Sequence, residues 1–297
     1  MKEQHFYPKP GKDFVSTEEI EQITTRAETY LEAEFPVNLS GPTGSGKTTL
    51  ALHLASQFDQ AAVMIQGDEE LGTSELIGKE GSFSKKKVVD NYIPSVLKTE
   101  ERATTRWHAK ALTEACKKGH ILIYDEFSRS RPEANNVLLS VLEEGILNLS
   151  TRGSRDSYIQ VHPEFKAIFT SNPTEYVGVY GTQDALVDRM ITIELNNYSE
   201  ETETKITARK AGIHDERAGQ IVSLIRRLRK QTSTGLHQFT LRSAIKIARA
   251  ASELDLVPSW SNELFRKICL DVLTKPNGNG EGPDTEQFVL DQIQETL

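Results

Sequence analysis

Eight residues near the start of the chain have the types and spacing needed to hold a chain of phosphates. The run Gly41-Pro42-Thr43-Gly44-Ser45-Gly46-Lys47-Thr48 matches the pattern G-x-x-x-x-G-K-[ST] at every defined position. Its glycines allow backbone angles that turn successive N–H groups onto phosphate oxygens. Lys47 supplies a mobile positive charge for the β- and γ-phosphates, and the Thr48 hydroxyl is a ligand for Mg²⁺. The run, extended by Thr49, predicts a nucleoside triphosphate site; the alternative is a glycine-rich turn that matches by chance.

Acidic and amide side chains at the ends of two later apolar runs would complete such a site. Asp125 and Glu126 follow Ile121–Tyr124, where a buried strand should end. Asp125 would hold Mg²⁺ through its water shell, and Glu126 would orient or deprotonate the attacking water. Asn172, in Thr170-Ser171-Asn172-Pro173, would hold that water from the other side. The acidic pair would also suit a plain strand-to-loop boundary, and Ser, Asn and Pro are common turn residues.

Other chemistries lack their residues. The seven histidines contain no H-x-x-x-H pair, and no G-x-S-x-G run occurs, so neither a metalloprotease nor a serine hydrolase is supported. Cys116 and Cys269 are isolated, which gives neither a disulfide framework nor a zinc site. Two lone thiols favour a reducing, cytoplasmic location.

The composition also favours the cytoplasm. Charged residues make up 26% of the 297, mean hydropathy is −0.45, and no run approaches the ~18–20 apolar residues of a membrane span. No apolar core follows Met1–His5, so we expect no secretory signal and no membrane partner. The net charge of −8 argues against binding to nucleic acid, despite basic clusters at Lys85–Lys87 and Arg226–Lys230.

A parallel sheet is needed to bring these side chains together. Short apolar runs that predict five buried strands alternate with helical patterns, the strands being 37–39, 61–65, 121–124, 167–170 and 191–193 and the helices 17–34, 49–55, 104–118 and 132–142. Such alternation predicts an αβα sandwich around a parallel sheet. The runs 146–149 and 158–161 flank a polar tip and predict a hairpin.

Beyond Asn196 the chain has only helical patterns, at 200–211, 216–230, 240–254 and 261–274, and then a loop at 276–283 before a last helix around Phe288–Ile293. We therefore expect three parts. They are an extended arm over residues 1–16, an α/β nucleotide-binding domain over 17–197 and a small all-α domain over 198–297.

The order of these features resembles that of the AAA+ ATPases. The phosphate-binding loop, Asp125-Glu126, Asn172, Asp188-Arg189 and a helical lid with Arg242 follow the family's order. The resemblance implies ATP and Mg²⁺ as ligands. It implies that Asn172 is sensor 1, that Arg189 is an arginine finger reaching the neighbouring subunit's γ-phosphate, and that Arg242 is sensor 2.

Two local features refine the resemblance. The run 125–132 is similar to the "DEINRA-P" stretch of the MoxR branch, and the runs 13–15, 35–42 and 171–176 are similar to the GvpN family of gas vesicle proteins. Two positions depart from the family pattern: Met190 stands where Phe is commoner, and Phe239–Arg242 replaces a Ser-Pro-Arg sequence. Both departures bear on the sensor 2 role of Arg242. Arg189 and Arg242 would otherwise be ordinary surface charges.

The resemblance also implies a homo-oligomeric ring, commonly a hexamer, that hydrolyses ATP to remodel or assemble gas vesicle shell or accessory proteins. An insert at about 82–119 and the hairpin 146–161 would point toward its pore, with Lys85–Lys87, Arg152 and Arg155 facing a substrate or solvent. Two alternatives stay open. The hairpin arginines favour a DNA-directed AAA+ enzyme, and a nucleotide-dependent binding module with little turnover is opposed by Glu126.

Overall fold

The computed structural model describes residues 5–89, 99–149, 158–173, 182–232, 239–274 and 285–297. For residues 79–89 and 99–109 it describes the backbone alone. Arg152, Arg155, the 174–176 part of the run 171–176 and the expected loop 276–283 lie outside the described residues.

A five-stranded parallel sheet forms the centre of the fold, as predicted. Its strands are β1 (Val37–Ser40), β2 (Ala62–Gln66), β5 (Ile121–Asp125), β8 (Lys166–Ser171) and β9 (Ile191–Glu194), in the order β2-β5-β8-β1-β9. All four strand pairs are parallel. The carboxyl ends of β1, β5 and β8 therefore meet at one edge, next to each other.

Helices cover both faces of the sheet because its strands are apolar on both sides. In β5, Ile121 and Ile123 join one buried cluster, and Leu122 and Tyr124 join the other. The first cluster lies under α1 (Glu18–Glu32) and α2 (Lys47–Ala55). The second lies under the shorter elements α3 (Thr73–Ile77), α4 (Ala111–Lys118), η1 (Phe127–Arg129), α5 (Pro132–Asn135), α6 (Val137–Glu143) and α7 (Thr182–Val187).

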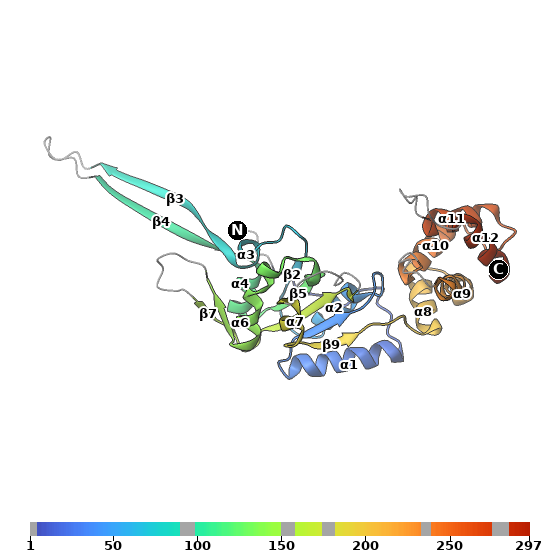
Figure 1. The fold of residues 1–297 in the computed structure, drawn as a ribbon, viewed down its shortest axis with the longest axis horizontal. Helices are drawn as coiled ribbons and strands as arrows, with labels where there is room; N and C mark the ends of the chain where they lie inside the picture. Colours follow the sequence, from blue (N-terminus) through green and yellow to red (C-terminus); the bar gives the residue numbers. More distant parts are fainter. Residues whose placement is uncertain (1–4, 90–98, 150–157, 174–181, 233–238, 275–284) are drawn as a thin grey trace.

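A long antiparallel ribbon replaces part of a predicted helix. Strands β3 (Gly78–Val89) and β4 (Thr99–Ala109) pair between α3 and α4 and project away from the sheet (Figure 1). The prediction of a helix over 104–118 was therefore wrong for residues 104–109. Thr104, Thr105 and Trp107 have side chains that suit a strand, and cross-strand pairing with β3 overrides the weak helical spacing there. From Ala111 the predicted helix is present.

The second hairpin has the expected arms. Strand β6 (Ile146–Asn148) pairs antiparallel with β7 (Tyr158–Gln160). Leu147 is fully buried against the second cluster, which anchors the base of this hairpin to the sheet domain.

The remaining described chain is helical, which confirms the predicted change after Asn196. Helices α8 (Glu200–Ala211), α9 (Asp215–Gln231), α10 (Leu241–Glu253), α11 (Glu263–Leu273) and α12 (Thr285–Thr296) enclose a third buried cluster. We call α8–α12 the lid; Figure 1 shows it at the opposite end of the molecule from the ribbon. The division at residue 197 falls between β9 and α8, and independent folding of the two parts stays a prediction.

The expected arm runs along the sheet domain. The Phe6 N–H donates to the Ala62 carbonyl (2.9 Å), and the Ala62 N–H donates to the Phe6 carbonyl (2.8 Å), so the arm adds one antiparallel bridge beside β2. Further on, the Lys12 carbonyl accepts a bond from Arg209 of α8. In the part of the chain that the structure describes, no helix is long and apolar enough to cross a membrane.

Candidate active site

The phosphate-binding loop connects β1 to α2 at the carboxyl edge of the sheet. Gly44 (φ 83°) and Gly46 (φ 86°) have left-handed backbone angles that other residues rarely adopt. Gly46 is the residue before α2, so the positive end of that helix points into the loop. Lys47 is 8% exposed, and its Nζ donates to the carbonyls of Gly41 and Pro42, both at 2.8 Å. The loop is thus shaped to surround an anion.

Thr48 and the acidic end of β5 form one hydrogen-bonded group. The Thr48 hydroxyl donates to both carboxylate oxygens of Asp125, at 2.8 and 3.0 Å. Asp125 is 5% exposed and also accepts a bond from Thr170 Oγ1 at 2.6 Å. A hydroxyl and a carboxylate are hard oxygen donors, and Mg²⁺ is commonly held by few protein oxygens together with water and phosphate. Thr48 and Asp125 therefore fit a magnesium ion.

Glu126 leaves the strand in a different direction from Asp125. Its left-handed backbone (φ 52°, ψ 42°) turns the chain at this residue, and its N–H donates to Thr170 Oγ1 at 2.8 Å. Its carboxylate accepts from Arg129 Nη1 at 2.7 Å and from Gln66 Nε2 at 3.4 Å. The carboxylate is thus held at the mouth of the site by residues from η1 and β2.

Asn172 reaches the phosphate-binding loop from the neighbouring strand. Its Nδ2 donates to Thr43 Oγ1 at 3.2 Å, and the Gly41 N–H donates to the Ser171 carbonyl at 3.2 Å. Strands β8 and β1 are adjacent, so this contact follows directly from the strand order. An amide in this position can orient a water beside the terminal phosphate.

The lid closes the loop from the other side. Thr240, which caps α10, and Arg242 of the same helix lie so close to Gly44 that a Cβ atom there would be 3.0 Å from Thr240 Oγ1 and 3.4 Å from Arg242 Cβ. Arg242 itself is exposed at the edge of the site. A side chain at position 44 would therefore push the lid and the loop apart.

A pocket of about 170 Å³ continues from the loop between the arm and the lid. Thr49, Lys210 and Arg242 contribute polar groups, and its apolar lining includes Phe14, Ile20, Leu50, Ile206 and Ile245. The Phe14 ring stacks on His53 of α2, with 3.6 Å between ring centroids. Burial lowers the pKa of His53, which favours its neutral form in this stack. Apolar walls next to a phosphate-binding loop suit a nucleotide base, and we call this cavity the base pocket.

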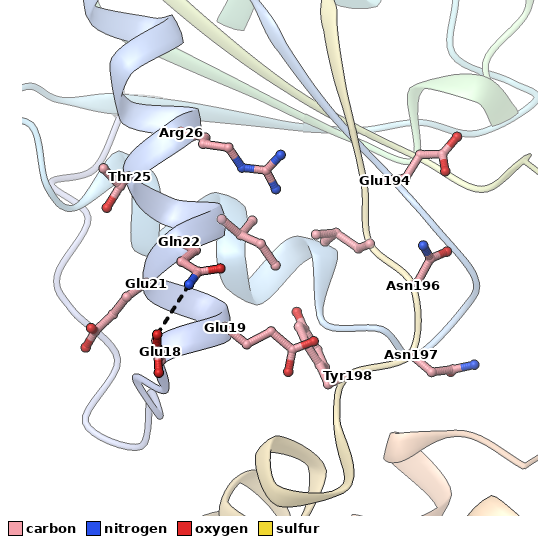
Figure 2. A pocket seen from close by; sticks show the side chains of 12 residues that line it. Glu18, Glu19, Glu21, Gln22, Thr25, Arg26, Glu194, Asn196, Asn197 and Tyr198 are labelled. Carbon is pink, nitrogen blue, oxygen red and sulfur yellow. Dashed lines mark hydrogen bonds between the residues drawn. The ribbon is translucent and has the colours of Figure 1, made fainter.

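A second pocket, of about 890 Å³, is a different site (Figure 2). It lies between α1 and residues 194–198, and its rim carries the carboxylates of Glu18, Glu19, Glu21 and Glu194 against one guanidinium, Arg26. Carboxylates repel phosphate, so size does not make this the nucleotide site. Tyr198 lines both this pocket and the base pocket, and burial together with Glu19 raises its pKa to about 12.

Arg189 is not part of this chain's own site. It precedes β9 and so lies at the amino end of that strand, whereas the phosphate-binding loop follows the carboxyl end of β1, which pairs with β9 in parallel. Its guanidinium donates to Glu143 from Nε (2.8 Å) and Nη2 (2.5 Å) and to the Ala185 carbonyl. The other predicted residues gather around one loop, and Arg189 does not.

Several contacting residues were not predicted from the sequence. Thr170 belongs to a predicted strand end, where a β-branched residue is expected to pack in the core. It is indeed 0% exposed, but its hydroxyl also donates a hydrogen bond to Asp125. No pattern in the sequence indicated that Gln66 or Arg129 would contact Glu126. Gln66 only follows the predicted strand 61–65, and Arg129 only lies in the run 125–132. Phe14 lies in the run 13–15, whose family resemblance implies no role in the site, and Tyr198 lies outside any motif. Only the packing of the arm and of the segment between β9 and α8 brings these two aromatic residues to the loop.

Thiol and metal-cluster chemistry find no support in the described residues. Cys116 and Cys269 are both 0% exposed, and burial raises the pKa of each to about 12, so neither is an available nucleophile. No group of three or more His, Cys, Asp or Glu side chains in the described part of the chain could hold a metal ion.

Comparison with known proteins identifies the family to which the chain belongs. Residues 36–190 match the family model described as an AAA domain of the dynein-related subfamily. The chain is 43% identical to the gas vesicle ATPase GvpN of Ancylobacter aquaticus over 268 residues, which are 90% of this chain and 74% of that protein. It is 40% identical to the gas vesicle ATPase GvpN of Haloferax mediterranei over 272 residues, 91% and 76% of the two chains.

Among solved structures, a Thermotoga maritima RuvB mutant has a similar fold, with a TM-score of 0.54 at 17% identity, over 90% of this chain and 74% of that one. The shared fold and the extended sequence identity to two gas vesicle ATPases lead to one assignment. The chain belongs to the AAA+ ATPases, in the MoxR-like branch and the family of the gas vesicle ATPase GvpN, and is an ATP-hydrolysing enzyme.

Proposed function

We propose that the protein is a Mg²⁺-dependent, ring-forming ATPase that assembles or enlarges gas vesicles in the cytoplasm. The observation that carries the enzymatic part is the bonding of Thr48 and Thr170 to Asp125 directly beside the phosphate-binding loop. The gas vesicle part rests on relatives of 43% and 40% identity that are named gas vesicle ATPases.

Substrate binding divides among three parts of the chain. Residues 41–49 would hold the phosphates through backbone N–H groups and the Lys47 ammonium. The base would lie in the pocket between Phe14 and Ile245, where apolar walls favour a flat ring. Thr48 and Asp125 would hold Mg²⁺, whose chemistry is to neutralise charge on the β- and γ-phosphate oxygens.

Hydrolysis needs a base and a means of placing water. Glu126 is the candidate base, and Asn172, bonded to Thr43 beside the terminal phosphate position, would orient the attacking water. In the observed arrangement Glu126 pairs with Arg129, so its carboxylate would turn from that partner toward the water during turnover. Arg242 lies on the lid beside Gly44 and would contact the phosphates when the lid closes.

A ring would complete the site. Arg189 lies at the far end of β9 and cannot reach the phosphate-binding loop of its own subunit. Its side chain is 31% exposed and pairs with the exposed Glu143. The guanidinium would therefore be available to bind the γ-phosphate held by a neighbouring subunit. An arginine supplied by a neighbouring protein contributes ~10³–10⁵ in rate in GTPases. We expect a hexamer, with the ribbon β3–β4 and the β6–β7 hairpin directed at a substrate in its pore.

The test separates binding, turnover and partner. Lys47→Ala should lose ATP binding, whereas Glu126→Gln should bind ATP and turn it over at least ~100-fold more slowly, since general-base catalysis contributes ~10²–10⁴. The ATP-bound Glu126→Gln form should then retain gas vesicle proteins that wild-type protein releases. Full turnover by Glu126→Gln would refute the mechanism. An ATPase rate that responds to DNA and not to gas vesicle proteins would refute the proposal that gas vesicle proteins are the partner.

A further inference from the structure

Two groups, one from the lid and one from the segment that joins it to β9, lie beside the two left-handed glycines of the phosphate-binding loop. Thr240 Oγ1 lies 3.0 Å from the position of a Cβ at Gly44. At Gly46 the corresponding neighbour is the Tyr198 hydroxyl, at 3.9 Å. Tyr198 belongs to the hinge between β9 and α8, and Thr240 caps α10. The loop therefore lies close to the lid at one point and to the hinge at another.

Both points are tied to one buried carboxylate. Arg229 donates from Nε to the carbonyl of Phe239, the neighbour of Thr240, at 2.9 Å, and from Nη1 to Glu203 Oε1 at 2.9 Å. Arg226 donates from Nη1 to the Tyr198 carbonyl at 2.8 Å and to Glu203 Oε2 at 3.0 Å. Each oxygen of Glu203 thus holds one arginine, and each arginine holds one loop-contacting segment.

Burial makes this arrangement stiff. Glu203 is 2% exposed, and a carboxylate removed from water must keep its charged partners. Arginine's planar fork holds two acceptors in a fixed geometry. The loop, the cap of α10, Arg229, Glu203, Arg226 and the hinge form a closed circuit around a pocket of about 210 Å³. A shift of the loop on one side of the circuit must move the lid on the other.

We propose that Arg229, held by Glu203, is a positioning residue that couples nucleotide at the phosphate-binding loop to the orientation of the lid. Arg229 acts through Phe239 and Thr240 and does not touch the nucleotide itself. The inference goes beyond the proposed function but needs its nucleotide site. Because such coupling is reciprocal, loss of Arg229 must weaken nucleotide binding as well as loosen the lid.

The same helix offers a matched control. Arg227 of α9 pairs with Glu295 and donates from Nε to Gln292 at 2.9 Å, both on α12 and within the lid. Arg227→Met and Arg229→Met each remove an arginine with an ion pair from α9, but only Arg229 reaches the cap of α10. If Arg229 only stabilised the lid, both variants would lower thermal stability and would change nucleotide affinity to the same extent.

The experiment measures the melting temperature with and without saturating Mg-ADP, the Kd for Mg-ADP, and KM and kcat for ATP. Arg229→Met should raise the Kd and KM by about 5–150-fold, the usual range of coupling between sites, and should reduce the ADP-induced rise in melting temperature. Arg227→Met should keep the wild-type Kd and ADP-induced rise. Arg229→Lys, which keeps the charge without the fork, should fall between Met and wild type and reports the coupling if Arg229→Met does not fold.

Equal Kd values for wild type, Arg229→Lys and Arg229→Met would overturn the inference while leaving the proposed function intact. Equal losses in Arg227→Met and Arg229→Met would overturn it as well, because the effect would then be general loosening of the lid. A wild-type protein that Mg-ADP does not stabilise would refute the nucleotide site and this inference together.

Discussion

At the scale of single residues, Thr170 links the two acidic residues of the candidate site, although its place in the run 170–173 implied no such role. Thr170 donates to Asp125 Oδ1 at 2.6 Å and accepts from the Glu126 N–H at 2.8 Å. One hydroxyl therefore orients the candidate magnesium ligand and fixes the backbone of the candidate base. Partners of metal ligands commonly matter nearly as much as the ligands themselves.

Thr170→Val should lower kcat by about 10–100-fold, because Val has a similar shape but no hydroxyl for Asp125 or the Glu126 N–H. The measurement is steady-state ATP hydrolysis at saturating Mg-ATP. Thr170→Ser is the control and should keep most of the activity. If Thr170→Val and Thr170→Ser turn over ATP equally, the hydroxyl has no part in orienting the acidic pair.

At the scale of elements, the contact between the phosphate-binding loop and α10 decides how the lid can move. Gly44 has a left-handed backbone, and a Cβ atom added there would lie 3.0 Å from Thr240 Oγ1 at the α10 cap, so this position has both a conformational and a steric requirement. Gly212, at the end of α8, is also left-handed (φ 68°) but has nothing within 4 Å of a built Cβ. The pair separates backbone strain from loss of the lid contact.

Gly212→Ala should lower the free energy of unfolding by roughly 1–2 kcal/mol, the cost of left-handed backbone for a residue with a Cβ, and should leave the Kd for ATP unchanged. Gly44→Ala should show the same loss of stability and a weaker Kd by at least about tenfold, equivalent to about 1.4 kcal/mol. Urea unfolding and nucleotide titration measure the two effects. An unchanged Kd in Gly44→Ala would mean that the lid contact is not needed for binding.

The ribbon shows how tertiary pairing changes an element. Helical spacing continues from Trp107 through Ala111, Leu112 and Ala115, so the sequence pattern extends the helix back to residue 104. Residues 99–109 nevertheless pair with 78–89, and the helix begins at Ala111. Pairing between segments that are separated in the sequence is not visible in a local pattern.

At the scale of the whole molecule, the chain separates its phosphate-binding loop from Arg189. The loop follows the carboxyl end of β1 and Arg189 precedes the amino end of β9, and the two strands are parallel neighbours. A parallel sheet therefore keeps the two groups at opposite edges of one subunit. A head-to-tail ring brings such opposite surfaces together at each interface.

Mixing two inactive variants tests that arrangement. Lys47→Ala and Arg189→Ala should each hydrolyse ATP poorly, and their equal mixture should recover activity at about a quarter of the interfaces, where an intact loop meets an intact arginine. ATPase rates before and after subunit exchange give the measurement. Mixing Arg189→Ala with the double variant Lys47→Ala/Arg189→Ala is the control, since no interface is then complete. Mixed rings that stay inactive would show that Arg189 does not act across subunits.

The sequence by itself determined the parts of the site that are local. The phosphate-binding loop, the acidic pair at the end of β5 and the five apolar strands are continuous runs, because phosphate binding by backbone N–H groups and burial of a strand both depend on neighbouring residues. Asn172 followed from its place at a strand end. The helical lid followed from its 3.6-residue periodicity.

Only the tertiary structure decided which distant residues meet. Strand order placed Thr170 on Asp125 and Asn172 on Thr43, and packing of the arm and hinge brought Phe14 and Tyr198 to the loop. The circuit through Glu203 joins residues from two helices and two connecting segments that share no sequence pattern. These contacts depend on the free energy of packing separate elements, which the types and spacing of neighbouring residues do not specify.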